Sequence, residues 1–221
     1  MTDFQIPNHR HMDNKWLVHR LAHDFQLLDV WEYPIVFDES DNDSLYAFRK
    51  FAVEPTLKDA FNFSPSGALF FLRTVFGKVF RIDENVNNVP IPGCSEISLA
   101  ERMSETEQRR HDDELNIDIR TDNYLDFRPV YSFQNETLNE ISNATEHTLM
   151  HYAWVRDDSG YYKVQMANYV KHRNKVGEIY VRSIEPFRYR VVYPYLFNKF
   201  VQHWHHYKQL QKPATANVDA V

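Results

Sequence analysis

Two strand-like runs joined by a tight turn, and the long aromatic stretch that follows them, constrain the fold of this chain most strongly. The runs are residues 146–155 and 161–171, the turn is the DDSG sequence at 157–160, and the stretch is residues 177–207. In the second run one face is mainly apolar and the other more polar, as in a sheet with one face covered by helices. In the final stretch apolar residues recur every three or four positions. This order predicts an α+β fold, a curved antiparallel sheet closed by a long C-terminal helix, a shape that often encloses an apolar pocket.

The N-terminal half carries signals for additional helices. Asp13 is a suitable N-cap for a helix at 14–23, and Ser64 followed by Pro65 is a typical helix start. The further elements predicted there are a strand at 25–36, a turn at 38–44, a helix from Leu45, the helix from Ser64 to Phe80 and a loop at 83–93.

The region before the hairpin is less regular. Residues 101–126 hold nine acidic and four basic side chains, which predicts a solvated surface segment with a short helix. Residues 127–133 read as a strand, and 137–143 fit a short helix or a strand. Pro186 and Pro194 interrupt the final stretch, so a kink or break is expected near each.

Length and composition narrow the class of protein. With 221 residues, we expect one domain over residues 1–212 and a disordered tail at 213–221. The formal net charge of −6 argues against a general nucleic-acid binder. The longest apolar run, residues 67–80, contains Arg73 and Lys78 and is too short to span a bilayer. A single cysteine, Cys94, excludes an internal disulfide and fits a cytoplasmic setting, which we expect.

Several short segments resemble a known family. They are the run YVRSIEPFRYRVVYP at 180–194, QMA at 165–167, Trp154-Val155 and FRP at 127–129. Together they resemble the bacterial domain of unknown function 2867 family over about residues 25–204. The resemblance implies a START-like, helix-grip fold with a cavity between the sheet and the C-terminal helix. It supplies no catalytic residue.

The hairpin and the final helix carry the candidate ligand-binding residues. Large aromatic side chains with polar tips suit a ligand cavity, and an arginine at its mouth can pair with a carboxylate or phosphate. The same aromatic residues are also typical of an ordinary core, and the arginine of a solvated helix face. The candidates are Tyr152, Trp154, Tyr162, Met166, Tyr169 and Arg188.

Histidines supply the candidates for chemistry. His151 and Asp126 are candidates for a general acid or base, because histidine titrates near neutrality; an ordinary sheet histidine is the alternative. His147 and His151 share a strand face, but about 13 Å separates residues four apart on a strand, too far to share a metal. His19 and His23 could share one on a helix, without a third ligand nearby. We therefore expect no metal, and no Gly-rich nucleotide-binding motif predicts a cofactor.

Three functions remain open at this point. The first is a binding protein that holds a small hydrophobic molecule between the sheet and the C-terminal helix. The second is an enzyme of the cyclase, dehydratase or isomerase kind that uses the same cavity. The third is a protein-interaction module whose acidic segment docks a basic partner. We favour the first and keep the other two as alternatives, since one fold hosts many functions.

Overall fold

The computed structural model describes residues 4–38, 43–53, 55–56, 96–114, 128–142 and 144–211. The predicted helix from Ser64, the loop at 83–93, the candidate Asp126 and the tail at 213–221 lie outside these residues.

One antiparallel sheet organises the described chain. Its six strands follow the order β1-β2-β6-β5-β4-β3. Their bounds are β1 Gln5–Ile6, β2 Gln26–Glu32, β3 Arg128–Ser132, β4 Glu136–Ser142, β5 Glu146–Arg156 and β6 Tyr162–His172.

The predicted hairpin is confirmed and forms the centre of the sheet. β5 and β6 pair along their whole length, from Glu146 opposite His172 to Arg156 opposite Tyr162. In the connecting turn the Asp157 carboxylate accepts the backbone N–H groups of Ser159 and Tyr161. Gly160 adopts a φ of 87°, a left-handed conformation that glycine takes without steric cost. The ambiguous stretch at 137–143 is a strand, β4, because it pairs with β5 in continuous register.

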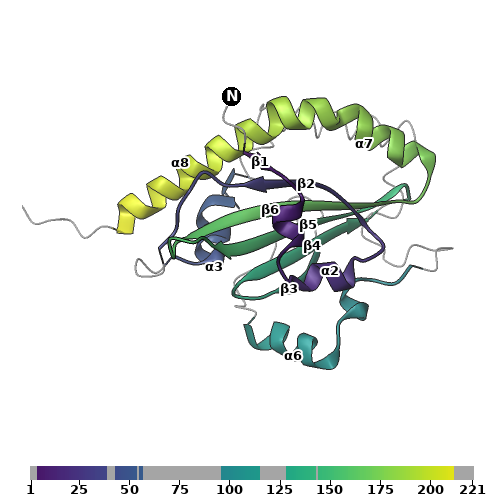
Figure 1. Ribbon diagram of the computed structural model, residues 1–221, viewed down its shortest axis with the longest axis horizontal. Helices are drawn as coiled ribbons and strands as arrows, with labels where there is room; N and C mark the ends of the chain where they lie inside the picture. Colours follow the sequence, from purple (N-terminus) through teal and green to yellow (C-terminus); the bar gives the residue numbers. More distant parts are fainter. Residues whose placement is uncertain are drawn as a thin grey trace, which may run out of the picture.

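The C-terminal helix is confirmed as a long arch over one face of the sheet (Figure 1). It consists of α7 (Lys175–Phe187), the π-helical turn η4 (Arg188–Val192) and α8 (Tyr193–Gln211). The side chain of Asn174 caps the start of α7 by accepting the backbone N–H of Gly177. Pro186 and Pro194 bracket η4, where the missing proline N–H groups disturb the regular α-helical hydrogen bonds.

Aromatic packing fills the space between the sheet and α8. Phe197 of α8 packs on Tyr33 and Trp31, at ring-centroid distances of 4.5 and 5.8 Å. Helix α3 (Leu45–Phe48) and the π-helical turn η2 (Arg49–Val53) close the same core. Among the described residues no helix is long and apolar enough to cross a membrane.

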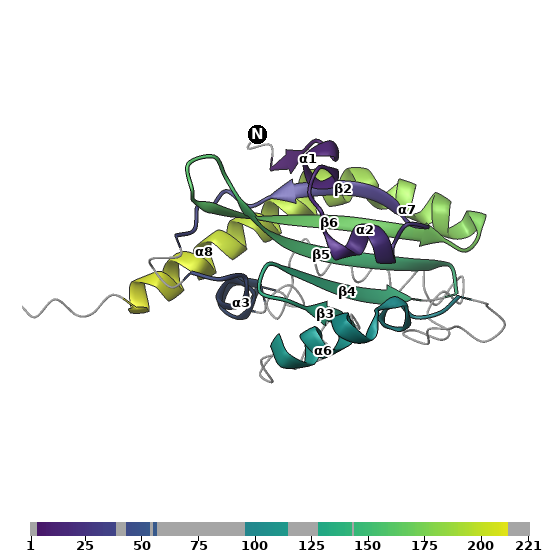
Figure 2. The same ribbon diagram turned by 60° about the horizontal axis from the view of Figure 1, so that its bottom comes forward.

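The opposite face of the sheet is covered by a second layer (Figure 2). Its elements are α1 (His9–Met12), α2 (Leu17–Leu21), the 3-10 turn η3 (Ala100–Arg102) and α6 (Glu105–Glu114). A separate apolar cluster lies beneath this layer, with Val18, Leu21 and Leu149 at its centre. The helix predicted at 14–23 is confirmed only over its central part, α2. Asp13 ends α1 instead of capping the predicted helix, and Trp16 has extended backbone before α2 begins. Both faces of the sheet are therefore buried.

Candidate functional site

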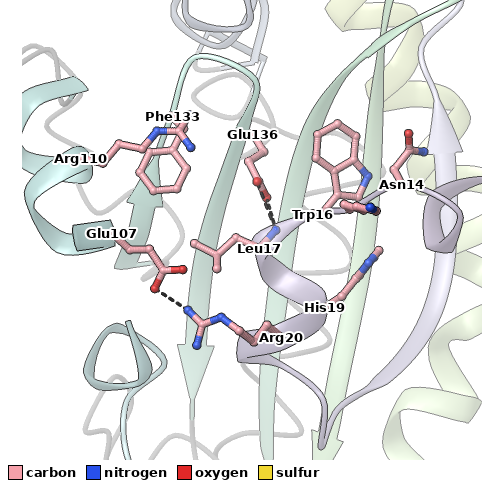
Figure 3. Close-up of a pocket in the computed structure, with 10 residues that line it drawn as sticks. Asn14, Trp16, Leu17, His19, Arg20, Glu107, Arg110, Phe133 and Glu136 are labelled. Atoms are coloured by element: carbon pink, nitrogen blue, oxygen red, sulfur yellow. Dashed lines mark hydrogen bonds and ion pairs between the residues drawn. The ribbon is translucent and has the colours of Figure 1, made fainter. Parts of the chain in front are cut away.

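An open pocket of about 510 Å³ lies on the face opposite the C-terminal helix. We call it the α2 pocket, because α2 and the residues before it form one wall, while α6 and the start of β4 form the other (Figure 3). Its lining residues are Asn14, Lys15, Trp16, Leu17, His19, Arg20, Glu107, Arg110, Phe133 and Glu136.

Glu136 is the most highly connected group of the α2 pocket. Its side chain is only 6% exposed. Its carboxylate accepts the Tyr131 hydroxyl at 2.7 Å and the Leu17 N–H at 3.1 and 3.2 Å, and it bonds His151 Nε2 at 3.0 Å. Burial alone would raise the pKa of Glu136, but the bonds to His151, Tyr131 and Leu17 bring the pKa below its ordinary value. Glu136 is therefore a buried carboxylate that ties α2 to the sheet.

Three histidines gather beside this carboxylate. The ring centroid of His11, from α1, lies 5.3 Å from that of His19 in α2 and 5.1 Å from that of His151 in β5. Trp16 and Tyr169 complete the group, with centroids 6.3 and 6.1 Å from His11. We call these five residues the histidine cluster. They reach the site from four separate elements of the chain.

Many polar atoms of the histidine cluster are buried without a hydrogen-bond partner. They are both ring nitrogens of His11, Nε1 of Trp16, Nε2 of His19, Nδ1 of His151 and the Tyr169 hydroxyl. Buried polar groups are hydrogen-bonded in most native structures, and each exception needs a physical explanation. The concentration of these atoms at one place makes the cluster a candidate site.

The histidine cluster disfavours positive charge. Burial, together with the neighbouring His151 and His19, lowers the pKa of His11 to about 2. Burial and His151 also lower the pKa of His19, against the opposing effect of Glu136. His11 is therefore neutral at pH 7 and offers one donor and one acceptor nitrogen.

The outer rim of the α2 pocket carries both charges. Arg20 forms an ion pair with Glu107 of α6, and the Arg110 guanidinium lies 4.1 Å from the ring centroid of Phe133. Figure 3 shows Trp16 and His19 on one side of the pocket and Arg110, Glu107 and Phe133 on the other. A molecule bound here would contact aromatic rings, neutral ring nitrogens and arginines at once.

The sheet divides the candidate residues predicted from the sequence between its two faces. Tyr152, Trp154, Tyr162 and Met166 belong to the core beneath the C-terminal helix. Tyr169 lies on the opposite face, in the histidine cluster, together with the candidate base His151.

Arg188 already has partners within the protein. It donates to Asp29 at 3.1 Å and to the Tyr193 hydroxyl. Asp29 also accepts bonds from Trp31 at 2.8 Å and Tyr189 at 2.8 Å. Although burial alone would lower the pKa of Arg188, Tyr193 and Asp29 raise it above the ordinary value. This buried pair joins η4 to β2.

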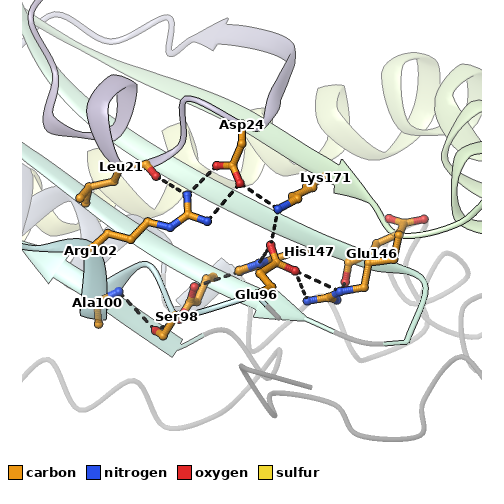
Figure 4. A network of polar contacts seen from close by, with 11 residues as sticks. Leu21, Asp24, Glu96, Ser98, Ala100, Arg102, Glu146, His147 and Lys171 are labelled. Carbon is orange, nitrogen blue, oxygen red and sulfur yellow. Dashed lines mark hydrogen bonds and ion pairs between the residues drawn. The ribbon is translucent and has the colours of Figure 1, made fainter. Parts of the chain in front are cut away.

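His147 belongs to a third polar group, an ion-pair network at the other end of β5 (Figure 4). Its ring lies between Glu96 at 3.1 Å and Glu140 at 2.9 Å. Arg173 and Lys171 also pair with Glu96, at 2.7 and 3.2 Å. The network fastens Glu96 to strands β5 and β6 and to Arg173. In the part of the chain that the structure describes, no group of three or more His, Cys, Asp or Glu residues is placed to hold a metal ion.

Sequence reasoning missed Glu136, His11, Trp16 and Arg110. The available signal was the density of histidines near the start of the chain, at positions 9, 11, 19 and 23. That signal does not identify the contacts, since Leu17 and Glu136 are separated by 119 positions.

Comparison with known proteins identifies the family. The family model described as "Protein of unknown function (DUF2867)" matches residues 21–195. Neither the curated proteins nor the solved structures contain a significant match. The matched range includes Glu136 and His151 but begins after His11, Trp16 and His19, so one wall of the α2 pocket comes from outside it. As the sequence resemblance predicted, the chain belongs to the DUF2867 family of proteins of unknown function.

Proposed function

We propose that this protein binds a small molecule in the α2 pocket. One observation carries the proposal: Trp16 Nε1 and His19 Nε2 are buried without partners, and both residues line this pocket. An unsatisfied buried polar group costs about 1–3 kcal/mol. Because both nitrogens are shielded from solvent, a ligand must enter between the side chains of the pocket wall to hydrogen-bond them. These bonds would remove the cost of the unsatisfied groups and so favour binding.

The rim indicates the chemistry of the ligand. Three basic residues, Lys15, Arg20 and Arg110, line the pocket together with two acidic residues, Glu107 and Glu136. This lining has more positive than negative side chains, which favours an anion. The aromatic rings of Trp16 and Phe133 favour a flat apolar body. These features together fit a small aromatic carboxylic acid with a hydrogen-bonding group.

Binding of a hydrophobic molecule between the sheet and α8 is a second candidate location. The π-helical turn η4 favours it, because π turns occur frequently at functional sites. The close packing of α8 on that face is less favourable: Tyr152 and Met166 are both 3% exposed. We therefore place the ligand in the α2 pocket.

Proton transfer is a second candidate function, which rests on the Glu136–His151 bond of 3.0 Å. A carboxylate that holds one imidazole nitrogen orients the ring and leaves the other nitrogen to accept or donate a proton. Nδ1 of His151 is the nitrogen without a partner.

The proposal is tested by ligand-detected NMR with a panel of aromatic carboxylates and their uncharged amides. We expect the carboxylates to bind more tightly than the amides, and Arg110→Gln to weaken their binding by about tenfold or more. The matched control is Arg109→Gln, because Arg109 is on the same helix, is 74% exposed and pairs with Glu105. Equal effects of the two substitutions, or no carboxylate binding, would refute the proposal.

A further inference from the structure

His11 fills a polar position on the sheet but hydrogen-bonds to it poorly. The residue is 0% exposed, neither ring nitrogen makes a hydrogen bond of good geometry, and a weak bond with the Gln165 side chain offsets only part of the effect of burial on its pKa. A leucine or phenylalanine would fill the same volume without burying two polar nitrogens. His11 is therefore a poor permanent occupant of this position in energetic terms.

The walls around His11 are also polar and unsatisfied. Nδ1 of His151, the Tyr169 hydroxyl and Oε1 of Gln165 are buried without partners, and these residues are at most 3% exposed. The rings of His151 and Tyr169 contact His11 directly, and the Gln165 side chain is near enough to hydrogen-bond His11 weakly, which raises the pKa of His11. Donors and acceptors are mixed, because Gln165 Oε1 only accepts whereas the hydroxyl and the imidazoles can do either.

The segment that carries His11 lies at the edge of the sheet, where β1 pairs with β2 and the Phe4 carbonyl accepts the Glu32 N–H at 2.8 Å. β1 contributes two residues to the sheet edge, and α1 has only four residues. The side chain of Asn8 donates to the Leu27 carbonyl at 3.3 Å, and Phe4 packs on Phe197 at 5.3 Å. Segments with few buried contacts open locally at low free-energy cost. The sheet residues beneath belong instead to the two central strands, β5 and β6.

We infer that the sheet face beneath α1, walled by His151, Tyr169 and Gln165, is a covered binding site for a neutral group that both donates and accepts hydrogen bonds, with His11 as its removable occupant. The chemical class is an azole ring or a hydroxyl-bearing ring of similar size. The inference deepens the proposed function and rests on it, because His19 and Trp16 border both this covered site and the α2 pocket. A ligand could reach inward from the pocket to the sheet once α1 moves.

The charges around the covered site explain why the occupant is neutral. The titratable groups that face His11 are His19 from α2, His151 from β5 and Tyr169 from β6, and Glu136 from β4 lies behind His151. The single carboxylate already bonds His151, Tyr131 and the Leu17 N–H, so it does not compensate a cation at the position of His11.

The experiment uses imidazole as the probe at pH 8, where most of it is neutral. His11→Ala should create room for one imidazole and bind it saturably, at least about tenfold more tightly than the wild type does. The shifts in the ¹H–¹⁵N spectrum should include His151, Gln165 and Tyr169. His11→Leu, which fills the space, should not bind. Thiophene, a ring of similar size without an N–H donor, should bind His11→Ala more weakly than imidazole.

Three results would overturn the inference: no saturable imidazole binding by His11→Ala, equal binding by His11→Leu, or thiophene binding as tight as imidazole. The wild type provides a test that needs no substitution. Imidazole should accelerate hydrogen exchange at the Met12 and Asp13 amides, which close α1 by bonding Asn8 and His9. Unchanged exchange at imidazole saturation would refute removal of His11. Aromatic-carboxylate binding, measured on the same variants, reports separately on the α2 pocket.

Discussion

Replacing Glu136 with alanine should destabilise the protein more than any exposed carboxylate substitution. The carboxylate bonds the Tyr131 hydroxyl, the Leu17 N–H and the His151 ring in a buried setting. Removing one member of a buried, hydrogen-bonded charged group costs about 3–5 kcal/mol, because the partners are left unsatisfied. Glu136→Gln keeps one acceptor oxygen, so we expect a smaller loss of about 1–2 kcal/mol.

Urea unfolding at pH 7, followed by circular dichroism, measures both values. Glu105→Ala is the matched control: its side chain is 93% exposed and lies 4.0 Å from Arg109, so its loss should have little effect. The stabilisation by Glu136 should also depend on pH. Because the folded-state pKa of Glu136 is lowered, its contribution is present above the unfolded pKa and is lost as pH falls through the folded value. A loss below about 1 kcal/mol for Glu136→Ala would refute the view that this carboxylate anchors α2.

Three further predictions concern His11, His147 and Gly177. Burial lowers the pKa of His11 to about 2, so the contribution of His11 to the free energy of unfolding is highest above about pH 6.5 and falls as the pH drops. In urea unfolding, the free energy of unfolding of His11→Leu should rise by about 2 kcal/mol relative to that of the wild type between pH 8 and pH 5. Burial alone would lower the pKa of His147, but Glu140 and Glu96 raise it. The stabilisation by His147 is therefore complete below about pH 6.5 and is lost as pH rises through the folded pKa. If the free energy of unfolding depended on pH in the same way for the wild type and for His147→Gln from pH 6 to 9, this assignment would be contradicted. A Cβ on Gly177 would lie 2.6 Å from the Thr145 carbonyl oxygen, so Gly177→Ala should lower the melting temperature despite better helix propensity, whereas exposed Ser183→Ala should not.

The hairpin and the C-terminal helix could be predicted because their signals are local. Alternation over residues 146–155 and 161–171 specifies strands, and the turn at 157–160 brings the two together. The short helices were harder to predict. α1 was not predicted, and the helix predicted at 14–23 is longer than α2, since nothing in the residue types reveals that Trp16 adopts extended backbone.

The candidate site could be predicted only in part. His151 and Tyr169 were identified as residues of interest, but not as neighbours on one face. Their neighbours His11 and Glu136 come from a four-residue helix near the start of the chain and from the beginning of β4. These residues meet because of the order of the strands and the packing of the helical layer on the sheet. Strand order and layer packing produce no periodic pattern in the sequence.

The sequence alone determined the α+β class, the central hairpin, the long C-terminal helix and the family, because each depends on residue patterns within a short span. The tertiary structure alone decided that α1, α2 and α6 cover the second face of the sheet and enclose the histidine cluster. The physical reason is that burial and hydrogen-bond satisfaction are properties of an assembled environment. A histidine has the same local sequence signal whether its nitrogens meet water, a carboxylate or no partner.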